Sequence, residues 1–434
     1  MRTLFSFIMA FALLLTVSQA QTPQQTEPQT VAECLAAVQQ YPNRQAEAAR
    51  KAGQKPDMRT YLAQAKELAK QYAARFKVQE VNESDLTSLA LLYFQADAPA
   101  LAREAINRRL KSANLSESDR ADALVTAIGI MMGGTPSDES IKFSEEYTAQ
   151  VDALSSAVLK QKINAHSRMA AYYGYADIDD KNLEHNTVML KLIDQLPTEE
   201  RAKYAGQQAS NYNRIAHVQA NRGSTDKALE TLRQGRAKIT TANATPMFDQ
   251  SIARYSMVGR PGAPLKGTYW LNAPPETKQL DLRGHVMLIQ FTAHWCGPCR
   301  KSYPAMLKFY EQFNARGLDV VMATELYGFF DKRQDLKAEE EMAANREYYL
   351  EHHKLPFKIA VEPRLEFSDR ASGEAAQRES NGGKYLVGGI PQIVLLDKQG
   401  VVRQILIGWD PANEAQMTKL IEQLLKEPAV ATKH

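Results

Sequence analysis

Helical spacing dominates the first half of the chain. In one stretch the residues at i, i+4, i+7 and i+11 form a single helix face: Leu159, Ile163, His166 and Ala170. Prolines are sparse from residue 31 to residue 256, and short breakers separate the helical stretches at residues 97–99, 133–136 and 222–224. This pattern predicts an all-α domain of helical hairpins over residues 31–256.

Small residues in this region indicate how its helices pack. Ile215, Ala216, Gly223, Ala228 and Leu232 match the tetratricopeptide pattern, in which small side chains let antiparallel helices approach closely. Residues 89–106 match it more weakly. An irregular helical bundle accounts for the composition equally well. The region is therefore predicted to be a degenerate tetratricopeptide-like array or a bundle.

The pattern changes after residue 256. Gly and Pro are concentrated at residues 260–275, which marks a boundary. Short β-prone runs then alternate with helical stretches; the runs are residues 285–292, 318–323, 357–361, 392–396 and 401–407. The predicted fold class is therefore multidomain: an N-terminal all-α helical-hairpin domain, and a C-terminal α/β domain over residues 257–434.

The first 20 residues are typical of a secretory signal peptide. Arg2 precedes an apolar run from Leu4 to Val17, and Ser18 to Ala20 supplies small residues for cleavage. The run is shorter than the about 20 residues of a membrane-spanning helix, although a retained anchor is the alternative. Residues 21–30 are predicted to be a flexible leader. We therefore expect an extracytoplasmic protein with no stable membrane span after cleavage.

Composition excludes several classes of protein. Lys and Arg number 53 against 50 Asp and Glu in 434 residues, with no broad basic stripe, so nucleic acid is not expected as a partner. Three cysteines are too few for a disulfide scaffold. Cys34 begins an amphipathic helix and is predicted to be a buried, inert thiol, with an intermolecular disulfide as the alternative.

The strongest chemical signal is Trp-Cys-Gly-Pro-Cys at residues 295–299, between a buried-type strand and a helix. Two cysteines at this spacing can close a small disulfide ring. Cys296 would sit at the helix start, where free N–H groups favour the attacking thiolate, and Cys299 would resolve a mixed disulfide. Pro298 loses nothing by lacking an N–H in the first turn. A zinc half-site and an inert disulfide are alternatives, but zinc usually needs a second ligand pair. We therefore predict neither a metal nor a cofactor.

Residues 291–300 resemble the active-site run of thioredoxins. Pro304, the Gly389-Ile390-Pro391 stretch and Gly408 also agree, and residues 258–264 with 282–284 resemble the secreted TlpA/ResA-like branch. The resemblance extends over about residues 258–425. It implies that Cys296 is the nucleophile and Cys299 the resolving thiol, that Ile390-Pro391 forms a cis-peptide loop holding an extended substrate, and that Trp295 covers the disulfide beside Gly297 and Pro298.

Two positions depart from this family. Thioredoxins have a buried acid where this chain has Gln290, and TlpA/ResA-like proteins often have a Glu where it has Ser302. Glu325 is therefore a candidate for proton handling, with a raised pKa if it is buried. His294 is a second candidate that would stabilise the thiolate when protonated, although a solvent-facing loop residue is the favoured interpretation.

Residues 327–389 form a long insertion for a thioredoxin. The insertion is either a solvated segment or a flap that recognises a partner.

The chain is thus predicted to be a thiol–disulfide oxidoreductase. It would exchange disulfides with protein clients and be recycled by a redox partner protein. A peroxiredoxin is not indicated, because its pattern has a single peroxidatic cysteine in a different setting. The alternative from another class is a helical adaptor whose thioredoxin-like domain serves mainly as a binding module.

Overall fold

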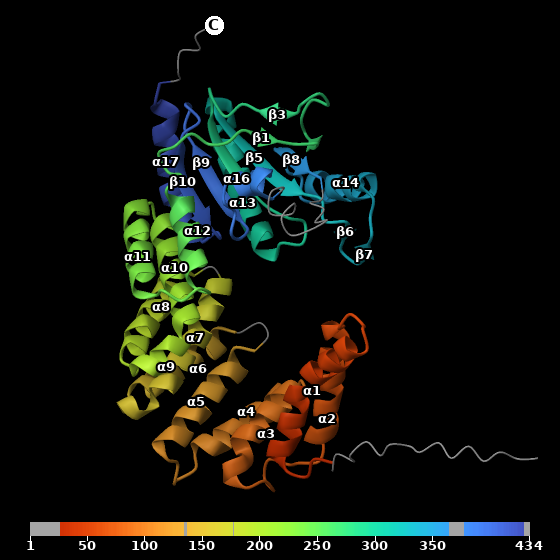
Figure 1. Cartoon of the computed structure of the whole chain (residues 1–434), viewed down its shortest axis with the longest axis vertical. Helices are drawn as coiled ribbons and strands as arrows, with labels where there is room; N and C mark the ends of the chain where they lie inside the picture. Colours follow the sequence, from red (N-terminus) through yellow and green to blue (C-terminus); the bar gives the residue numbers. More distant parts are fainter. Residues whose placement is uncertain (1–26, 134–136, 177, 364–376, 429–434) are drawn as a thin grey trace, which may run out of the picture. The chain divides into compact units, whose positions relative to one another are not determined.

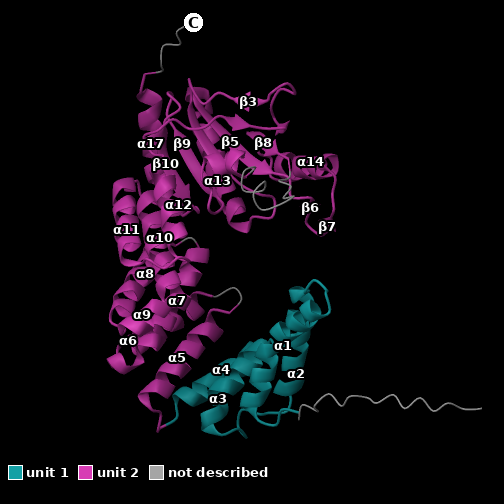
Figure 2. Cartoon of the chain, in the orientation of Figure 1, with its two compact units in different colours: residues 1–112 teal, residues 113–434 magenta. Residues whose placement is uncertain are grey.

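A computed structural model of the protein describes residues 27–133, 137–176, 178–363 and 377–428. The predicted signal peptide and most of the predicted leader lie outside these residues. The chain divides into two compact units, residues 1–112 and residues 113–434 (Figure 2). Among the described residues, no helix combines the length and apolar character needed to cross a membrane.

The first unit is helical. Its elements are α1 (Val31–Lys51), α2 (Met58–Ala73), the 3-10 turn η1 (Glu83–Asp85), α3 (Leu86–Gln95) and α4 (Pro99–Leu110). A capping box starts α1: the Thr30 hydroxyl accepts the Glu33 N–H at 3.2 Å, and the Glu33 carboxylate accepts the Thr30 N–H at 3.0 Å. Cys34 is buried, as predicted, and forms no disulfide within the described residues; burial raises the pKa of its thiol, which disfavours the reactive thiolate.

The second unit begins with more helices, which confirms the predicted helical region. They are α5 (Glu117–Met131), α6 (Asp138–Asp152), η2 (Ser156–Val158), α7 (Leu159–Tyr175), α8 (Asp179–Asp194), α9 (Thr198–Lys203), α10 (Ala205–Asn221), α11 (Thr225–Lys238) and α12 (Thr245–Tyr255). Neighbours pack closely because the contact positions are small: Ala216, Ala220 and Ala228 are fully buried. A tetratricopeptide-like repeat stays a prediction.

A mixed sheet follows these helices. Its strands lie in the order β10-β9-β4-β5-β8-β2, with β4, β5 and β8 parallel and the others antiparallel to their neighbours. They are β2 (Tyr269–Leu271), β4 (Val286–Phe291), β5 (Leu318–Glu325), β8 (Lys358–Glu362), β9 (Gln392–Leu396) and β10 (Val402–Ile407).

Shorter elements and helices surround this sheet. Small pairings join β1 (Leu265–Lys266) to β3 (Gln279–Leu280) and β6 (Phe329–Phe330) to β7 (Arg333–Gln334). The helical elements are α13 (Gly297–Phe313), η3 (Asn314–Arg316), α14 (Ala338–Arg346), a π-helical turn η4 (Glu347–His352), α16 (Asn381–Lys384), η5 (Pro411–Asn413) and α17 (Glu414–Lys426). The predicted α/β architecture is confirmed.

The two faces of the sheet are buried by different parts of the chain. Along β4 the side chains alternate: Val286 and Leu288 join the core beneath α13 and α17, whereas Met287, Ile289 and Phe291 point the other way. The core on that second face also contains residues of α10, α11 and α12, and in Figure 1 α12 lies next to the lower ends of β9 and β10. A strand that is buried on both faces consists almost entirely of apolar residues, and β4 does so.

The N-terminal helices therefore supply one layer of the C-terminal fold. Phe248 and Tyr255 of α12 are fully buried in the core that contains Val394 and Ile405 of the sheet. The boundary between the two compact units falls after residue 112 of the chain, whereas the composition predicted a domain boundary between residues 256 and 257. That predicted boundary falls within the second unit.

Helix α10 also covers the edge of the sheet. The Asn221 side chain accepts the Ile407 N–H at 3.0 Å and donates to the Ile407 carbonyl at 3.0 Å. Gln404 donates to the carbonyl of Ala220 at 2.5 Å. Because β10 is an edge strand, the two Asn221 bonds occupy backbone groups of Ile407 that would otherwise be open to another strand.

This packing predicts that residues 257–434 do not fold well alone. Their sheet face would be exposed to water, while residues 113–434 should unfold in one cooperative transition. Within the longer fragment, Phe248→Ala should cost about 3–5 kcal/mol because it leaves a cavity in the core that the helices share with the sheet. Urea unfolding monitored by circular dichroism measures both effects. Cooperative unfolding of residues 257–434 with an unchanged midpoint would contradict the shared core.

Candidate active site

The two paired cysteines lie where β4 leads into α13. Cys296 caps α13 and is joined to Cys299 by a disulfide, with the two Cα atoms 5.3 Å apart. The Cys296 Sγ accepts the backbone N–H of Cys299 at 3.1 Å. This N–H and the positive end of the helix dipole favour negative charge on Cys296 when the disulfide opens. Both cysteines are buried, and Cys296 keeps slightly more exposed surface (3%) than Cys299 (0%).

The loop before β9 lies against the nucleophile. The Ile390–Pro391 peptide bond is cis, and the Ile390 carbonyl oxygen lies 3.7 Å from the Cys296 Sγ. The next residue in this loop is bonded to the segment after β10: the Pro391 carbonyl accepts the N–H of Gly408 at 2.9 Å. Gly408 has φ +75°, a left-handed conformation that glycine adopts without strain.

A buried arginine from the helical layer supports the same loop. Arg254 of α12 donates from Nε to the carbonyl oxygen of Leu386 at 2.6 Å. A Cβ atom on Gly388 would lie 2.1 Å from the Arg254 guanidinium, so any other residue there would displace the guanidinium. Helix α12 thus holds the stretch that leads into Ile390 and Pro391.

Trp295 is the exposed aromatic residue of the site. Half of its surface (50%) remains open, and its ring packs edge-on against Tyr327 with centroids 5.5 Å apart. Tyr327 belongs to the insertion between β5 and β8. One end of this insertion therefore reaches the residue that precedes the nucleophile.

His294 is buried, so the prediction of a solvent-facing residue is wrong. Its exposed fraction is 5%, and its ring stacks on Phe330 at 4.4 Å with Phe329 and Tyr327 edge-on at 5.3 and 5.7 Å. Burial lowers the pKa of His294 to about 4. The imidazole is neutral at pH 7 and cannot supply a positive charge to a Cys296 thiolate. The aromatic partners lie on β6 and beside it, later in the chain, which is why local sequence did not reveal them.

Glu325 is partly buried at the end of β5, and burial raises its pKa as predicted. It pairs in register with Glu362 at the end of β8. Burial raises the pKa of Glu362 to about 7, against the opposing effect of the Asn381 N–H, which lies 3.0 and 3.1 Å from its two oxygens. Sequence reasoning missed Glu362, although it directly follows a predicted strand whose end meets that of β5 at one sheet edge.

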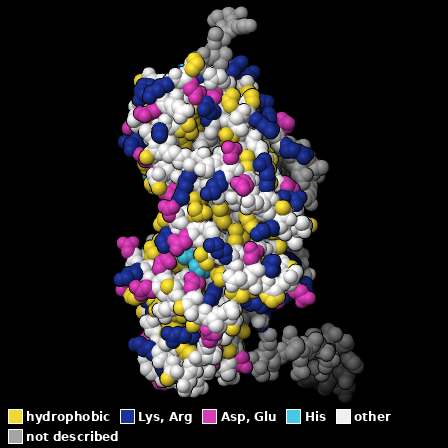
Figure 3. All heavy atoms as spheres, turned by 90° about the vertical axis from the view of Figure 1, so that its left-hand side faces the viewer, with side chains coloured by type: hydrophobic (Ala, Val, Ile, Leu, Met, Phe, Trp, Pro, Cys, Tyr) yellow, Lys and Arg dark blue, Asp and Glu magenta, His cyan; other side chains and the backbone are white. Residues whose placement is uncertain are grey.

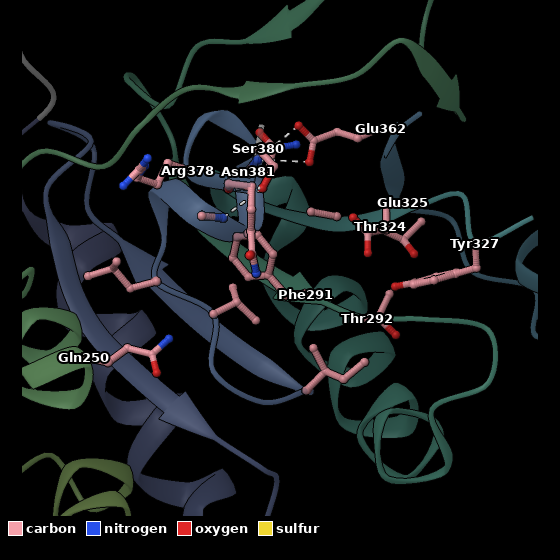
Figure 4. Close-up of a pocket in the computed structure, with 17 residues that line it drawn as sticks. Gln250, Phe291, Thr292, Thr324, Glu325, Tyr327, Glu362, Arg378, Ser380 and Asn381 are labelled. Atoms are coloured by element: carbon pink, nitrogen blue, oxygen red, sulfur yellow. Dashed lines mark hydrogen bonds between the residues drawn. The ribbon is translucent and has the colours of Figure 1, made fainter. Parts of the chain in front are cut away.

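These carboxylates face a cavity of about 410 Å³ at the ends of β4, β5 and β8. Figure 4 shows Thr292 near Tyr327 and Glu325, with Glu362 bonded to Asn381. The cavity also borders Ile390, so it adjoins the loop that contacts Cys296. By strand alternation, however, Glu325 shares a face with Val321 and Ala323, opposite α13.

Gln290 occupies the α13 side of β4. It is fully buried, and neither polar atom of its amide has a hydrogen-bond partner within the described parts of the chain. Ser302 is also buried and donates to the Cys299 carbonyl at 2.7 Å. The two positions where related proteins carry acids therefore hold groups that do not titrate near neutral pH.

Known proteins resemble this half of the chain. Residues 263–421 match the family model described as Redoxin. The C-terminal domain is thioredoxin-like. The thiol-disulfide oxidoreductase ResA of Bacillus cereus is 25% identical over 128 residues, which are 30% of this chain and 58% of that protein. ResA of Geobacillus thermodenitrificans is 23% identical over 133 residues, 31% of this chain and 60% of that protein. The chain thus spans less than two thirds of the length of these relatives.

Solved structures also align with this domain. The thioredoxin domain of a thiol-disulfide oxidoreductase from Bacteroides vulgatus is 19% identical, with a TM-score of 0.27, and covers 38% of this chain and 97% of its own. The family model and the ResA relatives confirm the predicted resemblance and support a redox function for the thioredoxin-like domain.

The buried His294 predicts a loss of stability in acid. Its folded-state pKa of about 4 lies below the ordinary value of 6.5, so folding excludes a proton that the unfolded chain binds. Stability should fall as the pH drops from 6.5 to 4, by at most about 1.4 kcal/mol per pH unit from this group. His294→Phe keeps a ring in the aromatic cluster and should flatten this slope. Urea midpoints at pH 7 and pH 5 test it, with the exposed His285→Gln as control; equal slopes would contradict the assignment.

Proposed function

We propose that this protein is an extracytoplasmic thiol–disulfide oxidoreductase that exchanges disulfides with protein clients through Cys296 and Cys299. The observation that carries the proposal is the pairing of these cysteines at the first turn of α13, with the Cys296 sulfur accepting a backbone N–H. The ResA relatives support the same chemistry. The sequence of residues 1–20 supports export from the cytoplasm.

The exchange takes place in two balanced steps. The Cys296 thiolate attacks a client disulfide, forming a mixed disulfide and releasing one client sulfur as a thiolate. Cys299, once deprotonated, then attacks the Cys296 sulfur, which closes the Cys296–Cys299 disulfide and releases the second client sulfur. Two electrons pass to the client, and a redox partner protein restores the dithiol. The same steps in reverse oxidise a client dithiol.

Groups around the sulfurs would position the client. Trp295, Gly297 and Pro298 form the rim on one side of Cys296, and Ile390 and Pro391 form the other. We propose that an extended client segment lies along this second side. The helical adaptor is the competing function, and reduction of insulin by the purified protein distinguishes the two, because a binding module without redox activity leaves insulin intact.

Cys299→Ser should trap clients on Cys296, since the resolving thiol is gone and the mixed disulfide persists. Non-reducing gels of extracytoplasmic extracts should show adducts that disappear on reduction. The adducts should be absent from the Cys296→Ser/Cys299→Ser variant. Adducts of equal intensity in that double variant would implicate Cys34 and refute the assignment of the nucleophile.

Proton transfer from Cys299 needs an acceptor, because Gln290 cannot titrate. We propose that Glu325 takes this role through water, because the cavity that Glu325 lines also borders Thr292 and Ile390, and the Ile390 carbonyl lies beside Cys296. Burial raises the pKa of Glu325, which makes its carboxylate a stronger proton acceptor than an exposed one.

Glu325→Gln should therefore slow the resolving step by about tenfold, which is less than the usual contribution of a general base because water also accepts the proton. The rate should also lose the pH dependence that the carboxylate gives it. Stopped-flow release of a fluorescent client thiol from the mixed disulfide measures this rate between pH 5 and pH 9. The exposed Glu339→Gln is the control. An unchanged pH profile in Glu325→Gln would exclude this carboxylate.

A further inference from the structure

Two buried histidines face each other between α7 and α8. The Nδ1 atoms of His166 and His185 lie 2.8 Å apart, and the two residues are 4% and 1% exposed. This separation is that of a hydrogen bond, so one Nδ1 atom carries the hydrogen and the other accepts it. The thiol exchange at the cysteines makes no use of this pair.

The outer nitrogen of each ring faces a carboxylate on α6. The Nε2 atom of His166 lies 3.1 Å from both oxygens of Asp152. The Nε2 atom of His185 lies 3.5 Å from Oε1 of Glu145, an oxygen that also accepts the hydroxyl of Tyr173 at 2.6 Å. The histidine pair is thus the middle of a row, carboxylate–imidazole–imidazole–carboxylate, that joins α6 to α7 and α8. Helix α7 packs on both of the others (Figure 1).

With both rings neutral, this row is one hydrogen short. Two neutral imidazoles carry two N–H groups. One of them fills the contact between the rings, and the other fills only one of the two contacts with the carboxylates. The remaining ring nitrogen then presents a lone pair to a carboxylate, which is costly for buried groups. Nε2 of His185 is a buried atom of this kind, without a hydrogen-bond partner among the described residues. One added proton completes all three contacts.

A second added proton does not fit. Both Nδ1 atoms would then carry hydrogen, and two N–H groups cannot face each other at 2.8 Å. Each ring could keep its own carboxylate, but the two rings would have to separate. The pair therefore holds one added proton and no more while α7 and α8 remain in this contact.

Charged groups surround the pair, and the acids are those in direct contact with its rings. The other charged or titratable groups are Tyr173 and Lys162 of α7, Lys181 and Glu184 of α8, and, beyond Asn182, Arg214 of α10 with Asp179. The contact with His185 and the bond from Tyr173 lower the pKa of Glu145 to about 2, against the effect of burial, so this carboxylate stays ionised. On the face shown in Figure 3, by contrast, histidine takes up little of the surface, and charges of both signs are interspersed.

The helices that the pair joins also contact the thioredoxin-like domain. The carbonyl of Tyr175, the last residue of α7, accepts the Lys301 ammonium group at 3.1 Å, and Lys301 lies two residues after Cys299 on α13. The N–H of Asp179, the first residue of α8, donates to the Asp410 carboxylate at 3.1 Å. A separation of α7 from α8 would therefore strain contacts that reach the redox domain.

We propose that His166 and His185 form a pH-sensitive switch, which holds one added proton near neutral pH and opens the contact between α7 and α8 when acid adds a second. Histidine is the side chain that ordinarily changes its charge between pH 5 and pH 8. Protons can reach the buried rings through their carboxylates, because the side chains of Asp152 and Glu145 are 42% and 29% exposed. The inference does not depend on the proposed redox function.

The spacing favours a proton over a metal ion as the ligand of the pair. Tetrahedral zinc with bonds of about 2.0–2.1 Å would hold the two nitrogens roughly 3.3 Å apart, which is wider than the observed 2.8 Å. The part of the chain that the structure describes also contains no group of three or more His, Cys, Asp or Glu residues placed to hold a metal ion.

The test locates the hydrogens by nuclear magnetic resonance of the full-length protein with ¹⁵N-labelled histidine. At pH 7 we expect hydrogen on both Nε2 atoms and a scalar coupling between the two Nδ1 atoms across their shared hydrogen. The coupling should disappear on acidification to about pH 4.5, as the second proton is bound. His166→Gln and His185→Gln should each abolish it, whereas His285→Gln, at an exposed site, should leave it unchanged.

Two results of this experiment would overturn the inference. An Nε2 atom without hydrogen at pH 7 would show a neutral pair, which is then an ordinary buried contact. A coupling that persists at pH 4.5 would show that no second proton enters.

Stability gives a second readout that needs no resolved signals. In acid the two unfolded histidines bind two protons and the folded pair binds one, whereas above pH 7 the folded pair keeps a proton that the unfolded chain releases. The equilibrium constant for unfolding should thus be smallest near pH 6.5, the ordinary pKa of histidine, and rise on both sides by up to about tenfold per pH unit.

The variant His166→Gln/His185→Gln isolates this effect, because its amides keep polar groups in the site while its difference from the wild type cancels other titrating residues such as His294. Urea midpoints between pH 5 and pH 8.5 measure the difference. We expect the stability advantage of the wild type to pass through a maximum near pH 6.5. An advantage that changes in one direction only across this range would contradict the switch.

Discussion

Apolar packing of α10, α11 and α12 on one face of the sheet is the contact on which the second unit depends. The sheet is buried on both faces, and α13 and α17 cover only one of them. Tyr212, Phe248 and Tyr255 cover the other, each contributing on the order of 1.5–3 kcal/mol of hydrophobic burial. Apolar packing alone does not fix how far α10 is shifted along the edge strand. The two hydrogen bonds between Asn221 and Ile407 do fix this position, because hydrogen bonds are directional.

This docking carries through to the active site. Arg254 lies on the helix that buries Phe248 and Tyr255, and its guanidinium holds the Leu386 carbonyl just before the loop that contacts Cys296. A guanidinium removed from water is costly unless its donors are satisfied, so this bond ties the position of α12 to that of the loop. The helical layer and the redox loop therefore cannot shift independently.

The features that could be predicted are those that depend on residues close together in the sequence. Periodicity identified the helices and strands, and the cysteine motif identified its own chemistry because Cys296 and Cys299 share one helical turn. Long-range packing was not visible. The helices of residues 205–255 show an apolar face without showing what covers it, and His294 was misplaced because Phe329 and Phe330 lie beyond an intervening helix and strand. Glu362 was missed because its neighbour Glu325 is adjacent only through strand register.

The distribution of charge around the sulfurs differs from the thioredoxin pattern, in which a buried acid lies on the strand before the cysteines. Gln290 and Ser302 leave the α13 side of the sheet without a carboxylate at those positions, so the Cys296 thiolate meets backbone dipoles with no nearby negative charge from either residue. The ionisable groups Glu325 and Glu362 lie instead on the far face, where burial raises the pKa of both. The backbone N–H that favours the thiolate and the carboxylates with raised pKa therefore lie on opposite faces of the sheet.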